Sequence, residues 1–215
     1  MQSSDQQHIK LTADGSTTVY SKCFDQHYHS IFGARQESDL VFIDLGLKYA
    51  LEQWEEIHLL EMGFGTGLNA WLSREWAEKE KRKVNYTGLE AFPIRPEMVK
   101  ELNFDARELH ELSWESIHHL SPWFSFQKLE TKLQDFNPEN KFNLVYYDAF
   151  APESQPELWT QEIFEKIASL MTEGGILTTY CSKGYVQRNL KAAGFKVEKH
   201  PGPARKREVL RAQLL

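Results

Sequence analysis

Three glycines occupy alternate positions, Gly63, Gly65 and Gly67, after a short apolar run that ends in the acidic Glu61. The segment that follows, 68–83, has the composition of a helix and contains no glycine or proline. A glycine loop between a strand and a helix lets a nucleotide-like ligand lie against the backbone. The dinucleotide fingerprint requires a third glycine three positions after the second, where this chain has leucine, so the spacing argues against NAD. The alternative is an ordinary tight turn between strand and helix.

Two more carboxylates follow segments that are expected to be strands. Glu90 closes the segment 84–91, and Asp148 closes the apolar part of 143–150. An acid at the end of the second strand of a doubly wound fold hydrogen-bonds ribose hydroxyls, although an ordinary exposed glutamate is the alternative. Asp148 is followed by Phe150 and a proline, so an aromatic ring near the acid can support a flat substrate. The alternative for Asp148 is a residue that only caps the segment after its strand.

The elements that position these residues alternate along the chain. Helices are expected over 68–83, 96–119, 156–171 (stopped by Gly174 and Gly175) and 185–193, and strands over 57–61, 84–91, 124–130, 143–150, 176–182, 196–200 and 208–213. This alternation predicts an α/β fold with a mainly parallel sheet, helices on both faces and a closing hairpin with one antiparallel strand. Before it, residues 8–20 have the pattern of a hairpin, and 25–44 are expected to pack over the ligand edge. We therefore expect a β-rich extension over 1–50 and one globular unit over 51–215.

The composition bounds the class of protein. A hydrophobic content of 41% with 26% charged residues is ordinary for a globular chain, and no apolar run approaches the ~20 residues that span a bilayer. The first residues lack the apolar core of a signal peptide, so a cytoplasmic location without membrane contact is expected. Cys23 and Cys181 are far apart, and the histidines lack carboxylate or thiol neighbours at ligand spacing. We expect no disulfide framework and no metal site.

The charge is unevenly distributed. The net charge is −6, but residues 183–215 carry nine Lys or Arg against two Glu, a net of +7 that leaves −13 on residues 1–182. A positive tail on an acidic body indicates a face for a polyanion, and a solvated surface is the alternative. The residues expected to contact phosphates are Lys183, Arg188, Arg205, Lys206 and Arg207.

Four segments in order, LLEMGFGTGLNAW, YYDAFAPESQPELWT, GYVQRNLKAAGF and PARKREVLRA, resemble the methyltransferase part of the MnmC-type bifunctional tRNA modification enzymes. ADGSTTVYS, YHSIFGARQES and VFIDLG match as well, so the resemblance covers about 8–211. It implies the Rossmann-like fold of class I methyltransferases dependent on S-adenosyl-L-methionine (SAM), with the glycine loop holding the methionine end. The cofactor-binding residues implied are Glu61, Gly63, Phe64, Gly65, Thr66, Gly67, Glu90 and Asp148. Relatives often place an acid against adenine after the third strand, and here both Glu130 and Asp135 stay candidates.

The same resemblance implies a substrate and a catalytic pair. The sequence DAFAP is similar to the D-P-P-Y motif of amino-group methyltransferases, where an acid or amide side chain receives the hydrogens of the target amine. Asp148 and Phe150 are therefore the expected catalytic residues, and Tyr28 with Phe150 the walls of a uridine pocket. The implied reaction is N-methylation of 5-aminomethyl-(2-thio)uridine at the tRNA wobble position. We expect a stand-alone form without the flavin-dependent oxidoreductase domain. A separate enzyme would then supply the aminomethyl precursor.

Two other functions are compatible with the residues. One is a SAM-family transferase acting on a small amine, such as an aminopropyl transferase, whose fold also has an acid after the fourth strand. The other is a non-catalytic RNA-binding module that keeps the fold. The intact glycine loop, Glu90 and Asp148 favour an enzyme over the second of these.

Overall fold

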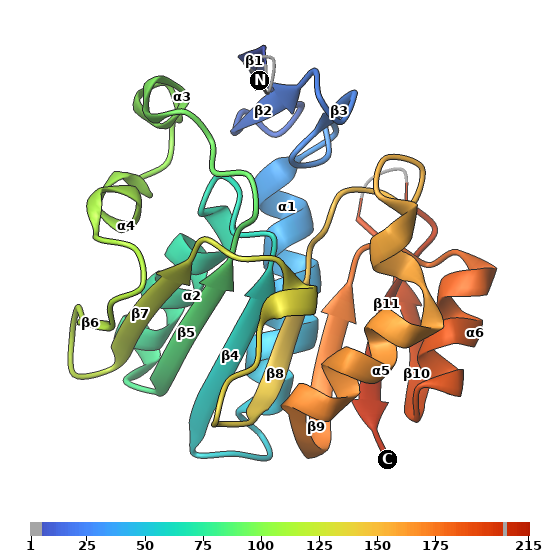
Figure 1. The fold of residues 1–215 in the computed structure, drawn as a ribbon. Coiled ribbons are helices and arrows are strands. Elements are labelled where there is room, and N and C mark those ends of the chain that lie inside the picture. Colours follow the sequence, from blue (N-terminus) through green and yellow to red (C-terminus); the bar gives the residue numbers. More distant parts are fainter. Residues whose placement is uncertain (1–5, 204–205) are drawn as a thin grey trace.

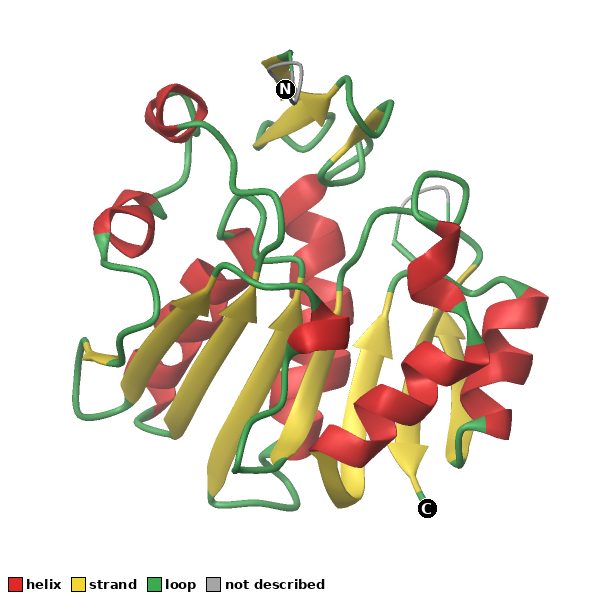
Figure 2. Cartoon of the chain, in the orientation of Figure 1, coloured by secondary structure: helices red, strands yellow, loops and turns green. Residues whose placement is uncertain are grey.

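The computed structural model describes residues 6–203 and 206–215, which form an eight-stranded sheet, helices on both of its faces, and a separate three-stranded sheet (Figures 1 and 2). Five strands of the large sheet run parallel: β4 (Glu56–Met62), β5 (Lys83–Leu89), β7 (Phe124–Leu129), β8 (Phe142–Tyr147) and β9 (Met171–Thr179). The spatial order is β10-β11-β9-β8-β4-β5-β7-β6.

A hairpin closes the sheet at one edge. Strand β11 (Glu208–Leu214) runs antiparallel to β9, and β10 (Phe195–Pro201) runs antiparallel to β11. The two-residue β6 (His118–His119) lies at the other edge, antiparallel to β7. A mainly parallel sheet closed by a hairpin with one antiparallel strand is the predicted class, so the expected fold is confirmed, and the short antiparallel β6 is an addition that was not predicted.

The register of the central strands sets up the site. Met62 at the end of β4 pairs with Leu89 of β5 on one side and with Tyr147 of β8 on the other. The residues that come next in the three strands, Gly63, Glu90 and Asp148, therefore leave the sheet at the same edge. Ligands of open α/β sheets bind outside this carboxyl edge.

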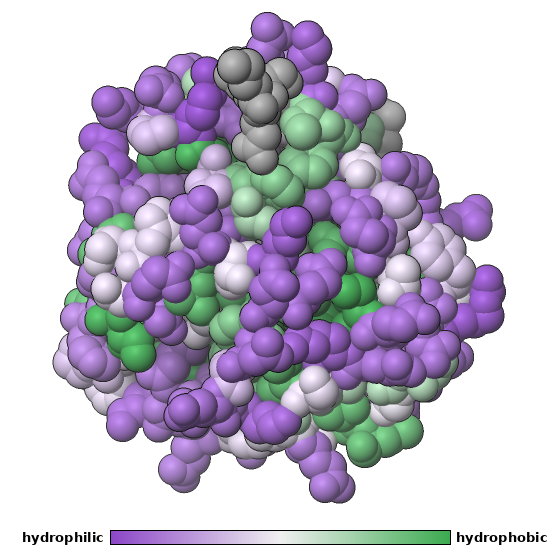
Figure 3. All heavy atoms as spheres, viewed as in Figure 1, coloured by the Kyte–Doolittle hydropathy of each residue, from purple (hydrophilic) through white to green (hydrophobic). Residues whose placement is uncertain are grey.

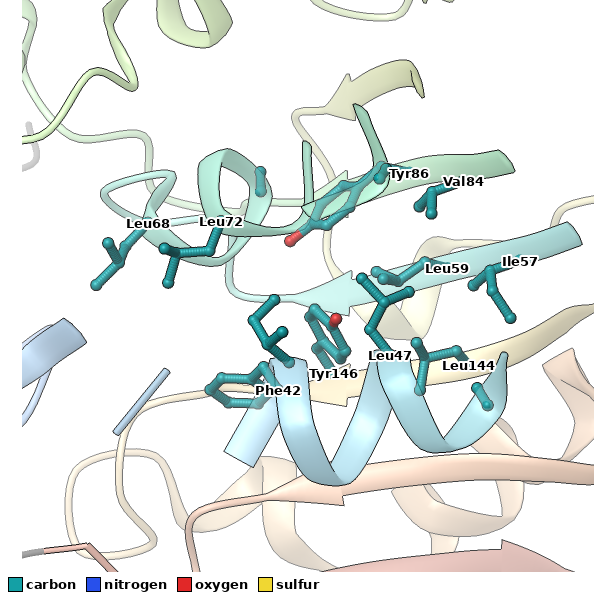
Figure 4. Packing of buried hydrophobic residues seen from close by; sticks show 14 of the residues in the cluster. Phe42, Leu47, Ile57, Leu59, Leu68, Leu72, Val84, Tyr86, Leu144 and Tyr146 are labelled. Atoms are coloured by element: carbon teal, nitrogen blue, oxygen red, sulfur yellow. The ribbon is translucent and has the colours of Figure 1, made fainter. Parts of the chain in front are cut away.

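Apolar side chains pack on both faces of the sheet. One cluster joins β4, β5 and β8 to α2 (Leu68–Glu80) and η1 (Asp39–Lys48), and Figure 4 shows Phe42 and Leu47 of η1 against Tyr146 and Leu144 of β8. The second cluster lies under α5 (Gln161–Leu170) and α6 (Gly184–Ala192). Complete burial of such side chains contributes about 1.5–3 kcal/mol each, so the two faces hold the strand ends in place.

The helix formed by α1 (Ala34–Ser38) and η1 was not predicted, because residues 25–44 were expected only as a covering segment. The second part of the helix is π-helical. Val41, Phe42 and Leu47 are at most 1% exposed, so this segment belongs to the main core. The boundary at residue 50 between an extension and a methyltransferase unit stays a prediction.

Two other expectations on helices were wrong. Residues 96–119 form only α3 (Pro96–Lys100) and α4 (Arg107–Glu111) before β6, because Asn103 between them bonds to the N-terminal hairpin instead of to a helix. Its side-chain oxygen accepts from the Thr17 amide at 2.9 Å, and its amide donates to the Gly15 carbonyl at 2.7 Å. The expected helix over 156–171 begins with the 3₁₀ turn η3 (Pro156–Trp159) and ends at Leu170, so Gly174 and Gly175 lie inside β9.

The N-terminal sheet consists of β1 (Gln7–Leu11), β2 (Thr17–Ser21) and β3 (Gln26–His27). The antiparallel pairing of β1 with β2 confirms the predicted hairpin. Figure 1 shows this small sheet beyond the carboxyl ends of the large sheet, and Figure 3 shows apolar residues at the surface below it. In the described part of the chain, no helix is long and apolar enough to cross a membrane.

Candidate active site

The glycine loop is pressed against the turn that carries Asp148. Gly63, Gly65 and Gly67 have φ values of +93°, +50° and +77°, which L side chains rarely adopt. A Cβ on Gly63 would lie 2.6 Å from the Asp148 carbonyl oxygen, and the Asp148 amide donates to the Met62 carbonyl at 3.0 Å. The loop and the Asp148 turn therefore fit together only with glycine at position 63.

Glu90 joins the glycine loop to the end of β5. Its carboxylate accepts from the Gly65 amide and from the Phe92 amide, each at 2.8 Å, and the residue is 8% exposed. Burial raises the pKa of Glu90 above its usual value, although hydrogen bonds from the backbone amides of Phe92, Gly65 and Ala91 oppose the shift. A buried acceptor next to the loop is where the predicted ribose contact would lie.

Beside Glu90 is a cavity of about 600 Å³, called here the cofactor cavity. Its walls include the backbone of Gly65, the apolar or aromatic side chains of Phe64, Ile94, Val99 and Trp114, and the carboxylates of Glu90 and Glu130. Phe64 is 3% exposed, and its ring packs at 4.9 Å from the His110 ring. Of the two candidates for an adenine contact, Glu130 lines this cavity, whereas Asp135 is not among its lining residues.

Asp148 is held from below by an amide. The Asn69 Nδ2 group donates to Asp148 Oδ2 and to Glu61 Oε1, each at 2.8 Å. Glu61 is fully buried, and burial together with the nearby Asp148 raises its pKa well above the usual value. Glu61 was expected to bind cofactor; the structure places its carboxyl under the loop, on Asn69, and it lines none of the cavities described here.

The pKa of Asp148 is raised to about 7. Burial is the largest cause and the nearby Glu37 carboxylate adds to it, while the hydrogen bond from Asn69 and the charge of Lys206 oppose the shift. A carboxyl with this pKa changes between acid and base near neutral pH, as a proton-transfer group requires. Sequence reasoning missed Asn69, whose only signal was a polar residue in the first turn of a helix after a glycine loop.

Aromatic rings surround Asp148 on its open side. Phe150 stacks on Phe24 with a centroid distance of 4.4 Å, and Tyr28 meets Phe150 edge-on at 4.8 Å. A Cβ on Gly65 would lie 2.7 Å from the Tyr28 ring, so Tyr28 covers the glycine loop. Tyr28, Gly65, Glu90, Asp148 and Phe150 line a narrow passage of about 40 Å³, called here the neck. The structure thus brings together Tyr28 and Phe150, as expected, and adds Phe24.

Polar contacts tie the N-terminal segment to the two loops of the site. His29 Nε2 lies 2.6 Å from Thr66 Oγ1, and the Gln26 side-chain oxygen accepts from the Ala151 amide at 3.0 Å. His110 Nε2 donates to the Thr66 carbonyl oxygen at 2.9 Å. Burial lowers the pKa of His29 and of His110 to about 4, so both rings are neutral at pH 7. Thr66 is fully buried, so its side chain fixes the loop.

A second cavity of about 380 Å³, called here the acceptor cavity, lies beyond the neck. Tyr28, Glu37, Asp148, Tyr180 and Lys206 are among its lining residues. Tyr28 and Asp148 line both this cavity and the neck, while Gly65 and Glu90 line both the neck and the cofactor cavity. Asp148 therefore lies where the neck meets the acceptor cavity, and the neck in turn borders the larger cofactor cavity at Gly65 and Glu90.

The basic residues of the C-terminal segment differ in their environments. Lys183 pairs with Glu153, and Lys206 pairs with Glu37 inside the acceptor cavity. Arg188 and Arg207 are exposed, and no ion pair is recorded for them within residues 6–203 and 206–215. Arg205 lies outside the described residues. Only Arg188 and Arg207 of the five expected phosphate contacts are thus exposed without a recorded carboxylate partner in the described chain.

The walls of the cofactor cavity fit SAM. Glu90 and Glu130 offer acceptors for ribose hydroxyls and an adenine amino group, and the apolar walls of the cofactor cavity suit a purine. Within the described residues, no group of three or more His, Cys, Asp or Glu side chains is placed to hold a metal ion.

Comparisons with known proteins agree with this geometry. Residues 90–215 match a family model described as S-adenosyl-L-methionine-dependent methyltransferase. The tRNA 5-methylaminomethyl-2-thiouridine biosynthesis bifunctional protein MnmC of Pseudomonas fluorescens (strain Pf0-1) is 29% identical over 230 residues, covering 97% of this chain and 35% of that protein. The chain thus spans about a third of the length of such curated relatives.

Solved structures share the fold. The crystal structure of MnmC2 from Aquifex aeolicus superposes with a TM-score of 0.79 at 30% identity, over 99% of this chain and 72% of that one. SAM-bound CalS10, an amino pentose methyltransferase from Micromonospora echinaspora, gives a TM-score of 0.53 at 11% identity, over 86% and 93% of the two chains. The second likeness concerns the fold alone.

Proposed function

The chain belongs to the family of S-adenosyl-L-methionine-dependent methyltransferases, and from this premise we propose that it methylates the 5-aminomethyl nitrogen of a wobble uridine in tRNA. The names of its relatives support this acceptor, because they join tRNA to a 5-methylaminomethyl product. The chain spans about a third of those relatives, so the proposal is confined to the methylation step. A separate enzyme would supply the aminomethyl precursor, and the reaction would take place in the cytoplasm.

The observation that carries the proposal is the position of Asp148, which lines both the acceptor cavity and the neck that borders the cofactor cavity. We assign SAM to the cofactor cavity, with Glu90 on the ribose hydroxyls, Glu130 on the adenine amino group and the backbone of the glycine loop at the methionine end. When bound, SAM supplies an activated methyl group on a sulfonium. The acceptor base would enter the acceptor cavity, and Asp148 at the neck would meet its amine.

Asp148 has two tasks in this mechanism. A primary alkyl amine is mostly protonated at neutral pH, as the lysine reference pKa of about 10.4 indicates, and an ammonium has no lone pair for attack. The Asp148 carboxylate would hold the ammonium and take its proton at the oxygen not bonded to Asn69. Tyr28 and Phe150 would hold the flat base. Such alignment of the reacting groups can lower the activation barrier by ~7–11 kcal/mol at the high end of proximity effects.

The direct test is methyl incorporation from labelled SAM into tRNA that carries 5-aminomethyluridine, followed by mass spectrometry of the nucleosides. We expect a 5-methylaminomethyl product that depends on both the tRNA and the 5-aminomethyl group. Transfer to polyamines or other small amines without tRNA would replace the proposal with a small-amine transferase. Calorimetric SAM binding without methylation of any tRNA would contradict it as well.

We predict that Glu90→Ala weakens SAM binding about 5- to 150-fold, the equivalent of the roughly 1–3 kcal/mol lost when a buried hydrogen-bonding group is removed. Isothermal titration calorimetry measures the affinity, and the thermal midpoint shows whether the variant is folded. Glu90→Gln is the matched control, because it keeps one acceptor oxygen for the Gly65 amide while removing the charge. Unchanged affinity in a folded Glu90→Ala protein would mean that the ribose lies elsewhere.

We predict that replacing Arg188 and Arg207 by alanine weakens tRNA binding and flattens its salt dependence. Each lost phosphate contact lowers the slope of log K against log salt by about 0.7–0.9. Filter binding between 50 and 300 mM salt measures the slope, and SAM affinity should not change. Lys199→Ala is the control, because Lys199 already pairs with Glu208 at 3.0 Å. A double variant with the wild-type slope would make this surface a solvated face.

A further inference from the structure

The Lys206 side chain is 34% exposed and lines the acceptor cavity. It lies in the connection between β10 and β11, and its ammonium pairs with Glu37, a side chain that is 9% exposed, on helix α1. The same ammonium lies 4.2 Å from the centroid of the Tyr180 ring, and Lys206 lines the acceptor cavity together with Asp148. Lys206 is thus held at the wall of the cavity by a partner 169 positions away in the sequence.

A fixed ammonium keeps hydrogen-bond capacity after it has formed one ion pair. A lysine has three N–H donors and no acceptor, and Glu37 takes one of them. Asp148 lines the same cavity as an acceptor of hydrogens, so Asp148 and Lys206 give its walls an acceptor and a donor of opposite charge. A ligand that fits both must present a basic amine and, close to it, a hydrogen-bond acceptor.

We propose that Lys206 donates a hydrogen bond to the C4 carbonyl oxygen of the uracil ring while Asp148 holds the aminomethyl group on C5. This inference rests on the function proposed above. C4 and C5 are bonded neighbours, so the carbonyl oxygen and the aminomethyl group leave the ring side by side. Lys206 is then a specificity residue: it accepts a uracil and disfavours a cytosine, whose C4 amino group is itself a donor.

The test combines a change in the protein with removal of the C4 oxygen from the substrate, a change that also removes the hydrogen on N3 and is therefore compared across the protein variants. Two tRNAs are ligated from synthetic anticodon arms, one with wobble 5-aminomethyluridine and one with the 4-deoxy analogue, 5-aminomethyl-pyrimidin-2-one riboside. Single-turnover methylation of each is measured with wild type, Lys206→Met and Lys199→Met. Work at pH 9, above the Asp148 pKa of about 7, limits the effect that loss of the nearby lysine charge has on the protonation of Asp148.

For the wild type, we expect the single-turnover rate constant divided by the tRNA dissociation constant to be about 10- to 100-fold lower on the 4-deoxy tRNA than on the complete substrate. This is the usual worth of a hydrogen bond to a charged group. On the complete substrate, Lys206→Met should be slower than the wild type by a similar factor. Going from the complete substrate to the analogue should cost Lys206→Met less than a further threefold, whereas Lys199→Met behaves as wild type. Equal losses in wild type and Lys206→Met on removing the oxygen would overturn the proposal, because the two changes would then be independent.

Two outcomes separate this inference from the proposed function. A wild type that methylates both tRNAs equally well overturns the role of Lys206 and leaves the function standing. A wild type that binds SAM and methylates neither tRNA overturns the function, and the inference with it. Because Lys206→Met leaves Glu37 buried without its partner, the double variant Glu37→Gln/Lys206→Met repeats the comparison in a protein without that buried charge.

Discussion

Asp148→Asn is expected to lower the rate of methyl transfer by about 10²–10⁴, the usual worth of a positioned acid–base group, while SAM affinity stays nearly unchanged. The amide oxygen of the new asparagine can still accept the hydrogen bond that Asn69 donates, so the geometry below the site is kept. What is lost is the carboxylate that holds the ammonium and takes its proton. Asp44→Asn, the same exchange at an exposed position paired with Lys48, should have no effect.

The pH profiles carry the sharper part of this prediction. Burial raises the pKa of Asp148 to about 7, so below that pH its carboxyl is mostly protonated and cannot take another proton. The wild-type rate should therefore rise as the pH passes through about 7, and rise again as more of the free amine becomes neutral. Asp148→Asn lacks the first rise. Single-turnover methylation from pH 6 to 10 isolates chemistry from product release. A loss below tenfold with parallel profiles would leave Asp148 as a positioning group only.

The sequence predicted the sheet and its edge well because both follow from alternation along the chain. Strands separated by helices force a parallel order, and a parallel order brings the residues after Met62, Leu89 and Tyr147 together. The helix over 34–48 was missed for a local reason. Its second part is π-helical and apolar on most sides, so the 3.6-residue period is absent. A Cβ added to Gly46, which lies within this helix, would be 3.0 Å from the Tyr146 ring. Glycine therefore allows the close approach of the helix to Tyr146.

The residues of the site that directly follow strands were predicted, whereas the side chains that contact them from distant parts of the chain were missed. The glycine loop, Glu90 and Asp148 are each next to a strand end, which the sequence marks. Contacts such as Gln26 with Ala151 join residues 125 positions apart, and no local pattern marks them. For the same reason Lys206 was assigned to a basic surface from its neighbours in sequence, although its partner Glu37 turns it into the acceptor cavity.

Gly63→Ala is expected to reduce SAM affinity at least about 100-fold. A residue other than glycine at a φ of +93° pays strain of about 1–3 kcal/mol, and here its Cβ would also lie 2.6 Å from the Asp148 carbonyl oxygen. The Cβ position is set by the backbone of residue 63 and its partner is a backbone oxygen, so no side-chain rotation relieves this clash. The loop and the Asp148 turn must separate, which moves the Gly65 amide from Glu90 and widens the neck.

Gly174→Ala separates the effect of close approach from that of backbone strain. Gly174 in β9 has a φ of +76°, close to that of Gly63, but the nearest atom to its added Cβ would be 3.9 Å away. Gly174→Ala should therefore lower the thermal midpoint and leave the calorimetric SAM affinity unchanged, whereas Gly63→Ala should lower both. Equal SAM affinity in the two variants would show that the contact between the loop and the Asp148 turn does not shape the cofactor site. If Gly63→Ala does not fold, Gly65→Ala provides the second measurement, because its Cβ meets the movable Tyr28 ring at 2.7 Å and should cost less affinity than a backbone clash.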